Sequence, residues 1–250
     1  MSRSINKEIE LFIAGINRGP LKSLIVDKKT ISMEYLTPRD DIYKIVVEQA
    51  WLDMNRTLVD NKKKSVRNKR SEAKGYLAGK LKDYFDKQPK KTEEAFDGYW
   101  YSEVISNIVD SQILSIGQTQ KLINMSFKYL YCCKWFFENK KDYFKYCHMP
   151  LDGYILNWYK REIDKEYDGQ AWSKIDNVSK YMNIENKIRN YYDGEIVLEK
   201  EFDIWMHEKK KAEKKKLLSY VNKIIKSPEC SPELKILLSE YSKKLESSEE

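Results

Sequence analysis

The chain has 250 residues, and 46 Lys and Arg against 39 Asp and Glu give it a formal net charge of +7. With 41% hydrophobic residues, the whole chain cannot be intrinsically disordered, because it has ample material for a packed core. Only 9 Gly and 6 Pro are present, which excludes a turn-rich β-sandwich or barrel. The composition therefore predicts an all-α protein, compact and built of many helices, with one large domain or two small ones.

The N-terminal elements are predicted to be helices around one ambiguous segment. Apolar residues at helical spacing predict a helix over residues 4–17. Residues 23–36 alternate around a polar turn and are compatible with one short β-hairpin. Thr37 and Pro38 then supply a cap and a first helical position for a helix that runs to about Val59.

A strongly basic segment follows. Residues 61–70 carry six positive charges and no negative one. Such a run is either a solvated loop or helix end, or a surface that contacts the phosphates of a nucleic acid. We expect residues 1–90, with this segment, to form an N-terminal helical part and residues 91–250 a helical core, unless both form one integrated domain. The candidate nucleic-acid contacts in the segment are Lys62, Lys63, Lys64, Arg67, Lys69 and Arg70.

The rest of the chain is predicted to be almost entirely helical. Thr92 fits the start of a helix, and the densest apolar region, residues 118–137, is expected to form a central core helix. The last helix has an apolar face that either packs within the chain or forms a homodimer contact. The other helices are expected over residues 72–86, 151–161, 172–191, 198–225 and 231–245.

Several classes of site and location are excluded or disfavoured. No apolar stretch is long enough for a transmembrane helix, and the first residues lack the apolar region of a signal peptide. We therefore expect a cytoplasmic protein with no membrane partner. Four cysteines, two of them adjacent, favour reduced thiols, and with only two histidines they argue against a zinc site. Because the standard catalytic and nucleotide-binding motifs are missing from the sequence, we expect neither metal nor cofactor.

Two chemically distinctive residues belong to the most apolar region. Lys121 follows Gly117 and Gln118 at the start of the core helix, where backbone N–H groups can bind an anion. Apolar surroundings disfavour the charged form of a lysine, so that its amine becomes more available as a nucleophile or base. Asp152 follows Pro150 at the head of the next helix, 152 − 121 = 31 positions later. A helix, a loop and a return span this separation, which allows the two side chains to meet in one cleft.

A purely structural interpretation of the same residues remains open. Lys121 and Lys128 would then extend from the core helix to solvent, and Asp152 would only cap the helix that begins near Gly153.

Two short motifs resemble a known family over about a fifth of the chain, roughly residues 112–160. They are Thr119-Gln120-Lys121-Leu122-Ile123-Asn124-Met125-Ser126-Phe127-Lys128 and Met149-Pro150-Leu151-Asp152. They resemble the catalytic stretch of the helix-hairpin-helix DNA glycosylase superfamily, particularly its archaeal 8-oxoguanine glycosylase branch. The resemblance implies that Lys121 attacks the sugar C1′ of a flipped-out nucleotide to form a Schiff base. Asp152 would accept the lysine proton and stabilise the positive charge that develops on the sugar. Lys128 is the alternative match for the lysine.

The same resemblance implies further contacts with DNA. Gly117, Gln118 and Lys128 would bind the nucleic acid, and Asn124, His148 and Trp158 would line the base pocket. The first hypothesis is therefore a DNA glycosylase, with or without lyase activity, that removes a damaged or modified base in repair or anti-phage defence. The second is a non-enzymatic, all-helical protein of phage or anti-phage origin that binds nucleic acid or protein.

Overall fold

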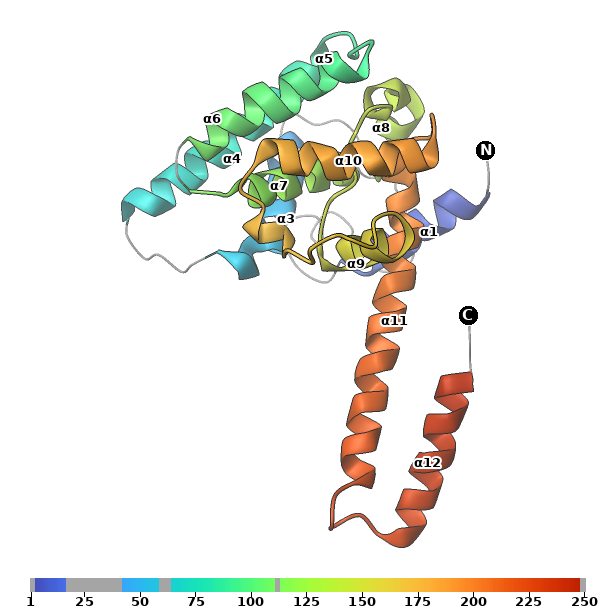
Figure 1. The fold of residues 1–250 in the computed structure, drawn as a ribbon. Helices are drawn as coiled ribbons and strands as arrows, with labels where there is room; N and C mark the ends of the chain where they lie inside the picture. Colours follow the sequence, from blue (N-terminus) through green and yellow to red (C-terminus); the bar gives the residue numbers. More distant parts are fainter. Residues whose placement is uncertain (1–2, 17–41, 59–63, 111–112, 248–250) are drawn as a thin grey trace. The chain divides into compact units, whose positions relative to one another are not determined.

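The computed structural model describes residues 3–16, 42–58, 64–110 and 113–247, which form helices and connecting loops (Figure 1). Strands are absent from these described ranges. The prediction of an all-α protein is thus confirmed. The β-hairpin considered for residues 23–36 lies outside the described residues.

The N-terminal helices are α1 (Arg3–Ala14), α3 (Ile42–Met54) and α4 (Lys64–Asp86). α4 begins 72 − 64 = 8 residues before the start predicted from Glu72, so the described part of the basic segment forms its first turns. The first turn of α4 has no acidic residue to offset the positive end of the helix dipole. The C-terminal half of α4 stabilises the whole helix, because it packs into the core. Its core residues are Leu77, Leu81, Tyr84 and Phe85.

The next helical stretch has three parts. α5 (Glu93–Asp97) is followed by the π-helical turn η3 (Gly98–Val104) and by α6 (Ile105–Val109). The Thr92 side chain accepts a hydrogen bond from the Ala95 N–H at 3.2 Å, which confirms the predicted N-terminal cap. The stretch brings Phe96, Trp100 and Tyr101 into the core.

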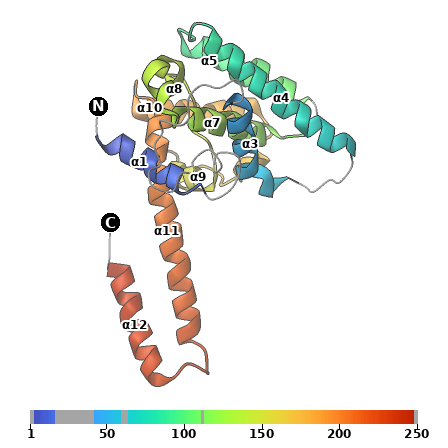
Figure 2. The same ribbon diagram turned by 180° about the vertical axis from the view of Figure 1, so that it is seen from behind.

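The core is organised around α7 (Ile116–Tyr131). Every residue of α7 except Gln118 is buried, as the apolar pattern predicts for a central helix. Figures 1 and 2 show α10 (Val178–Tyr192) on one side of α7 and α3 with α4 on the other. The helix ends at Tyr131 rather than at Phe137, and a separate short helix, α8 (Lys134–Asn139), follows.

Two connections bring later elements back to α7. α9 (Gly153–Glu162) begins after the loop that contains Pro150. Where one helix was predicted over residues 172–191, a single 3-10 turn, η5 (Trp172–Lys174), precedes α10. The helix restarts because the Asn177 side chain accepts a hydrogen bond from the Lys180 N–H at 3.2 Å and so caps α10.

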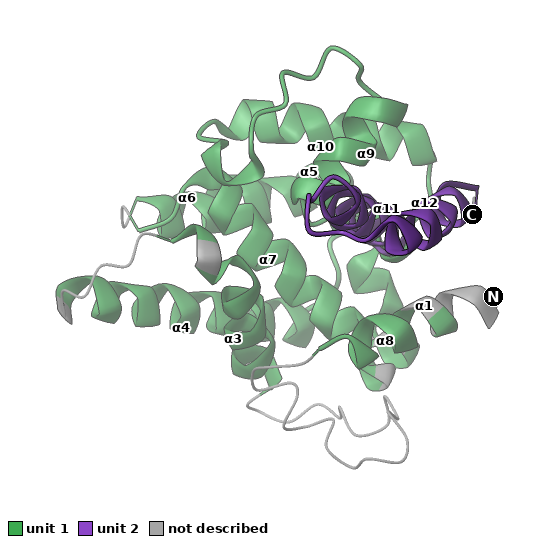
Figure 3. Ribbon diagram, turned by 90° about the horizontal axis from the view of Figure 1, so that it is seen from below, with its two compact units in different colours: residues 1–204 green, residues 205–250 purple. Residues whose placement is uncertain are grey.

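The chain divides into two compact units, Met1–Ile204 and Trp205–Glu250 (Figure 3). Residues on both sides of the expected boundary near residue 90 belong to the first unit, where Tyr84 and Phe85 pack against Phe127 of α7. α11 (Val197–Ile225) begins in the first unit and continues into the second, which also holds α12 (Pro232–Ser247). Within the described part of the chain, none of the helices has the length and apolar character that crossing a membrane requires.

Candidate functional site

The start of α7 is fixed by side-chain and backbone contacts. The Ser115 side chain accepts a hydrogen bond from the Gln118 N–H at 3.1 Å, and the Gln118 side chain accepts one from the Ser115 N–H at 3.0 Å. This capping box satisfies N–H groups that a helix N-terminus otherwise leaves open. The Gly117 N–H donates to the Ile175 carbonyl oxygen at 2.8 Å. The helix is therefore docked at its N-terminus, and Lys121 lies one turn further along.

Gly117 and Gln118 do not occupy the positions expected for DNA contacts. A Cβ on Gly117 would lie 1.7 Å from the carbonyl oxygen of Trp172, so this glycine allows a close approach of two backbone segments. The Gln118 side-chain amide donates to the Thr57 carbonyl oxygen at 3.2 Å. Both residues thus hold α7 against its neighbours, and in this structure their N–H groups are directed at protein oxygens rather than at a phosphate.

Lys121 and Asp152 meet, as their spacing predicts. Lys121 Nζ donates to Asp152 Oδ2 at 3.0 Å. The other carboxylate oxygen, Oδ1, accepts hydrogen bonds from the N–H groups of Tyr154 at 2.9 Å and Ile155 at 3.0 Å. Asp152 is therefore the N-terminal cap of α9 and the partner of Lys121 at the same time, one oxygen for each role. The structural and the chemical interpretations of this aspartate are compatible.

The pair lies close beneath the protein surface. The side chains of Lys121 and Asp152 are 7% and 11% exposed. Burial by itself would raise the pKa of Asp152, but the Lys121 ammonium and the Ile155 N–H outweigh it and leave the pKa below its usual value. Asp152 is thus a carboxylate at neutral pH, and it can accept a proton from Lys121 only when the environment of the pair changes.

Lys128 was considered both for contact with DNA and as the alternative nucleophile, and its position suits neither role well. Its side chain is 1% exposed and forms an ion pair with Glu201 of α11, which is 0% exposed. The Lys128 ammonium also lies 3.8 Å from the ring centre of Phe12 and 4.5 Å from that of Phe202. Because aromatic rings and a carboxylate enclose it, the Lys128 ammonium is less accessible than that of Lys121 and is the poorer candidate for the nucleophile.

A hydrogen-bonded network adjoins the pair in the core. The Asn124 side chain accepts from the Tyr101 hydroxyl at 2.5 Å and donates toward Gln120 at 3.0 Å and Tyr181 at 3.0 Å. Gln120 in turn donates to the Leu151 carbonyl oxygen at 3.1 Å, directly before Asp152. The network therefore ties α7, η3 and α10 to the loop that positions Asp152.

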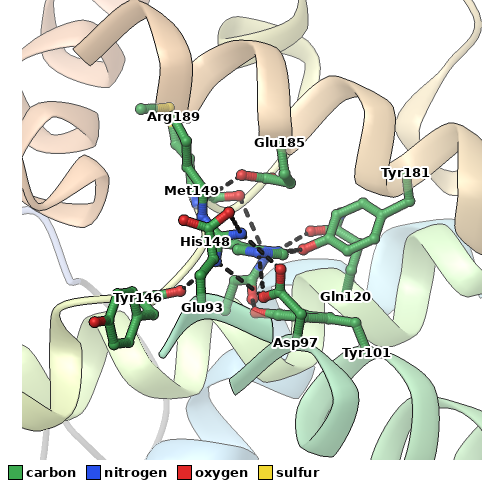
Figure 4. Close-up of polar contacts among 11 residues, drawn as sticks. Glu93, Asp97, Tyr101, Gln120, Tyr146, His148, Met149, Tyr181, Glu185 and Arg189 are labelled. Carbon is green, nitrogen blue, oxygen red and sulfur yellow. Dashed lines mark hydrogen bonds and ion pairs between the residues drawn. The ribbon is translucent and has the colours of Figure 1, made fainter. Parts of the chain in front are cut away.

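His148 extends this network to Asp97 and Arg189 (Figure 4). Its Nδ1 lies 2.6 Å from the Tyr181 hydroxyl, its Nε2 lies 3.0 Å from Asp97 Oδ1, and its ring stacks on Tyr101. Arg189 donates to both oxygens of Asp97, at 2.6 and 2.9 Å. Burial, followed by the Arg189 guanidinium, lowers the pKa of His148 to about 3, although Asp97 opposes the shift. His148 is therefore a neutral ring that links hydrogen bonds in the core.

The three residues expected in a base pocket are packing residues in this structure. Asn124 and His148 are 0% exposed, and their polar atoms face protein partners. Trp158 is on α9, where its ring stacks on Tyr192. Asn124 and His148 are thus held by other side chains of the core, and Trp158 packs against α10, while their place in a base pocket stays a prediction.

The basic segment is exposed where the structure describes it. Arg67 and Lys69 are exposed and Arg70 is partly exposed on the first turns of α4. Lys62 and Lys63 lie outside the described residues, and Lys64 is the first residue of α4. Arg67 and Lys69 thus project into solvent at a helix end whose dipole is also positive, where phosphates would be attracted.

The described residues also include a cavity, potential metal ligands and four cysteines. A cavity of about 160 Å³ is lined by Glu93, Tyr146, Arg189 and Val197 among others, and neither Lys121 nor Asp152 borders it. Within the described ranges, no group of three or more His, Cys, Asp or Glu side chains could hold a metal ion. The four cysteines are free and buried.

The sequence analysis did not single out Gln120 and Asp97 of the buried polar network, or Glu201, the partner of Lys128. Gln120 and Asn124 are four positions apart in an apolar helix, a spacing that places both on one face and that signals a shared hydrogen-bond site. No such signal marks Asp97 or Glu201. Comparisons of the chain with protein-family models, curated proteins and solved structures found no match.

Proposed function

We propose that this protein is a DNA glycosylase in which Lys121 is the nucleophile and Asp152 its proton acceptor. The observation that carries the proposal is the 3.0 Å contact between an amine and a carboxylate that are 31 positions apart, next to the surface of a hydrophobic core. The resemblance of residues 112–160 to the helix-hairpin-helix DNA glycosylases supplies the reaction class. It identifies the same two residues.

The chemistry begins with a proton transfer. At rest Asp152 is the carboxylate of the ion pair with Lys121, because its partners lower its pKa. Entry of a nucleotide into the site would part the ion pair and move a proton from Lys121 to the carboxylate. The free amine would then attack C1′ of the deoxyribose as the C1′–N bond to the base breaks, and the base would leave with the bonding electrons and take the proton from Asp152. The ionised carboxylate would next accept a proton from the new secondary ammonium and pass it to O4′ as the C1′–O4′ bond breaks. The ring-opened product is a Schiff base between Lys121 and C1′.

Lys121 is the member of the pair that would move. Asp152 is held by two backbone N–H groups at 2.9 and 3.0 Å, whereas Lys121 has a flexible four-carbon side chain. With 7% of the Lys121 side chain exposed, a nucleotide must displace part of the cover above the pair. We expect the Lys121 side chain to move toward the entering nucleotide while the Asp152 carboxylate stays in place.

The basic end of α4 would supply affinity for DNA. Arg67, Lys69 and Arg70 extend from its first turns, and phosphate contacts of this kind offset the cost of unstacking a base. A DNA substrate would place the protein in the cytoplasm. The excised base would be a damaged base in repair or a modified base in anti-phage defence.

The proposal is tested by trapping with borohydride, which reduces a Schiff base to a stable protein–DNA adduct. The full chain is incubated with duplexes that contain 8-oxoguanine, uracil or modified phage bases, and with an undamaged control. Adduct formation with one lesion, lost in Lys121→Gln and retained in Lys128→Gln, is expected. Circular dichroism must show that both variants are folded. If no duplex gives excised base or adduct, the glycosylase proposal is wrong.

A second candidate function is a non-enzymatic helical protein that binds nucleic acid or protein. The near-complete burial of Lys121 and Asp152 favours it, because a purely structural ion pair would look the same. Salt-sensitive DNA binding that is weakened by Arg67→Ala and Lys69→Ala, without excision or adduct, would support this function instead.

A further inference from the structure

The C-terminal unit has almost no core of its own. Within Trp205–Glu250, α11 and α12 run antiparallel (Figures 1 and 2). The residues of each helix that face the other helix form an inner seam. Val221 and Ser242 of this seam are buried, whereas its other residues are only partly buried. A hairpin this small rarely buries enough apolar surface to be stable alone. The partly buried seam residues are Leu218, Ile225, Lys235, Leu238 and Leu245.

A second set of large apolar side chains is exposed on the same two helices. On each helix they follow a spacing of three and then four residues, which forms one stripe along an α-helix. The exposed fractions are 40% for Leu217, 56% for Tyr220, 47% for Ile224, 43% for Leu234, 63% for Leu237 and 47% for Tyr241.

The two stripes lie on one face of the hairpin. Each exposed residue comes one position before a residue of the inner seam, as Tyr220 does before Val221 and Tyr241 before Ser242. One position is a rotation of about 100° about the helix axis. Because α11 and α12 run in opposite directions and their seams point at each other, the same rotation turns both stripes to the same side. The six residues therefore form a single apolar face.

We propose that this apolar face binds the apolar face of a second copy of the chain, so that two hairpins form a four-helix bundle. Two parallel stripes require a partner layer that is also two helices wide, and a second copy supplies one by twofold symmetry. Six side chains that each bury roughly 100 Å² would cover about 600 Å² per copy, near the lower end of stable interfaces. The expected product is a dimer of moderate affinity.

Charged residues at the borders of the face select one arrangement of the two copies. Lys216 and Lys223 border the face on α11, and Glu233 and Glu240 border it on α12; all four are exposed. A twofold axis parallel to the helices places α11 of one copy over α12 of the other, so that lysines meet glutamates. A perpendicular axis in the interface would place α11 over α11 and lysines against lysines. The first arrangement is therefore the one we propose.

The test compares two neighbouring residues in the full chain. Leu237 lies on the apolar face, and Ile236 lies about 100° away from it around α12, outside that face. The two side chains are 63% and 62% exposed, so neither substitution creates a cavity. Sedimentation equilibrium at about 1–100 µM should show a dimer for the unmodified protein, a dissociation constant raised about 100-fold by Leu237→Glu, and no change with Ile236→Glu. Circular dichroism should be the same for all three.

A charge exchange tests the arrangement. Glu240→Lys should weaken the dimer, and adding Lys216→Glu and Lys223→Glu to the same chain should restore it. A protein that stays monomeric over the whole concentration range overturns the proposal, as does a Leu237→Glu variant that dimerises normally. A monomer that uses the face to bind vesicles of anionic phospholipid would overturn it too, because a membrane would then be the partner.

Discussion

Two lysine–carboxylate pairs lie on the same face of α7 and differ in access. Lys121 and Lys128 are 128 − 121 = 7 positions apart, about two helical turns. The Lys121–Asp152 pair has side-chain exposures of 7% and 11%, whereas those of the Lys128–Glu201 pair are 1% and 0%. The pKa of Asp152 is lowered, but burial raises the pKa of Glu201 despite its lysine partner. An ion pair in a core therefore does not by itself identify a reactive site.

The difference follows from what surrounds each carboxylate. Asp152 begins a helix, and two backbone N–H groups stabilise its charge. Glu201 lies in the second turn of α11, four residues after Val197, and its side chain is fully buried, so that burial outweighs the stabilising effect of the Lys128 ammonium on its charge. The first pair lies close to the surface, and the second is enclosed in the core.

The largest expected loss of stability comes from breaking the buried Lys128–Glu201 pair. Lys128→Met leaves the Glu201 carboxylate buried without its partner and should lower the free energy of unfolding by about 3–5 kcal/mol. Lys121→Met should cost only about 1–2 kcal/mol, because the backbone N–H groups still stabilise Asp152. Urea unfolding followed by tryptophan fluorescence measures both. The double variant Lys128→Met with Glu201→Leu should regain most of the loss. Equal costs for the two single lysine variants would contradict the comparison.

The next effect concerns the end of α7 that carries Lys121. Gly117→Ala places a Cβ 1.7 Å from the Trp172 carbonyl oxygen and must shift the backbone, which should cost about 2–3 kcal/mol. It should also reduce adduct formation, although Lys121 and Asp152 are unchanged. Gly75→Ala on α4 is the control: a Cβ there meets nothing within 4 Å, and about 0.5–1 kcal/mol of added stability is expected. Normal stability of Gly117→Ala would show that α7 is not fixed in this way.

A third effect concerns the network beside the Lys121 pair. The pKa of His148 falls from 6.5 to about 3, so the unfolded chain binds more protons below pH 6.5 and stability must fall as the pH falls. Between pH 7 and pH 5 this contributes a loss of about 2 kcal/mol, which His148→Gln should remove.

The pH measurement compares the variant with the unmodified protein at each pH by urea unfolding. Burial raises the pKa of Glu185 well above its usual value, which favours the fold as the pH falls and opposes the effect of His148. Both proteins contain Glu185, so its contribution cancels in the difference. An unchanged pH dependence in His148→Gln would mean that the ring is protonated in the fold.

The smallest effect separates the two roles of Asp152. Asp152→Asn and Asp152→Ala both remove the charge that pairs with Lys121, but only asparagine can still cap α9. The alanine variant should therefore be less stable than the asparagine variant by about 1 kcal/mol in thermal or urea unfolding. Neither should form an adduct with DNA. Retained adduct formation in Asp152→Asn would remove the carboxylate from the proposed mechanism.

The contrast between the two pairs was only partly predictable from the sequence. The apolar pattern predicts α7 as the core helix, and the position of Asp152 after Pro150 predicts its place at a helix start near Lys121. The partner of Lys128 could not be predicted, because Glu201 is one of many carboxylates in the C-terminal half and only the packing of α11 selects it. The basic residues of α4 were expected in a loop or helix end, and tertiary contacts of its other half extend the helix over them.

The hydrogen-bond partners of Asn124 and His148 could not be predicted either. Polar residues close to a Lys–Asp motif suggest a ligand pocket, yet these two face partners on η3 and α10. Those partners are tyrosines whose hydroxyl groups supply the hydrogen bonds that buried polar side chains require. A single sequence does not indicate which tyrosines those are.

The most direct test of the difference between Lys121 and Lys128 is to identify the residue that becomes covalently linked to DNA. The adduct trapped by borohydride is digested with a protease and a nuclease, and tandem mass spectrometry locates the reduced sugar on the peptide. We predict that the modification is on Lys121 and that Lys128 is unmodified. Modification of Lys128, or of any amine other than Lys121, would contradict the account.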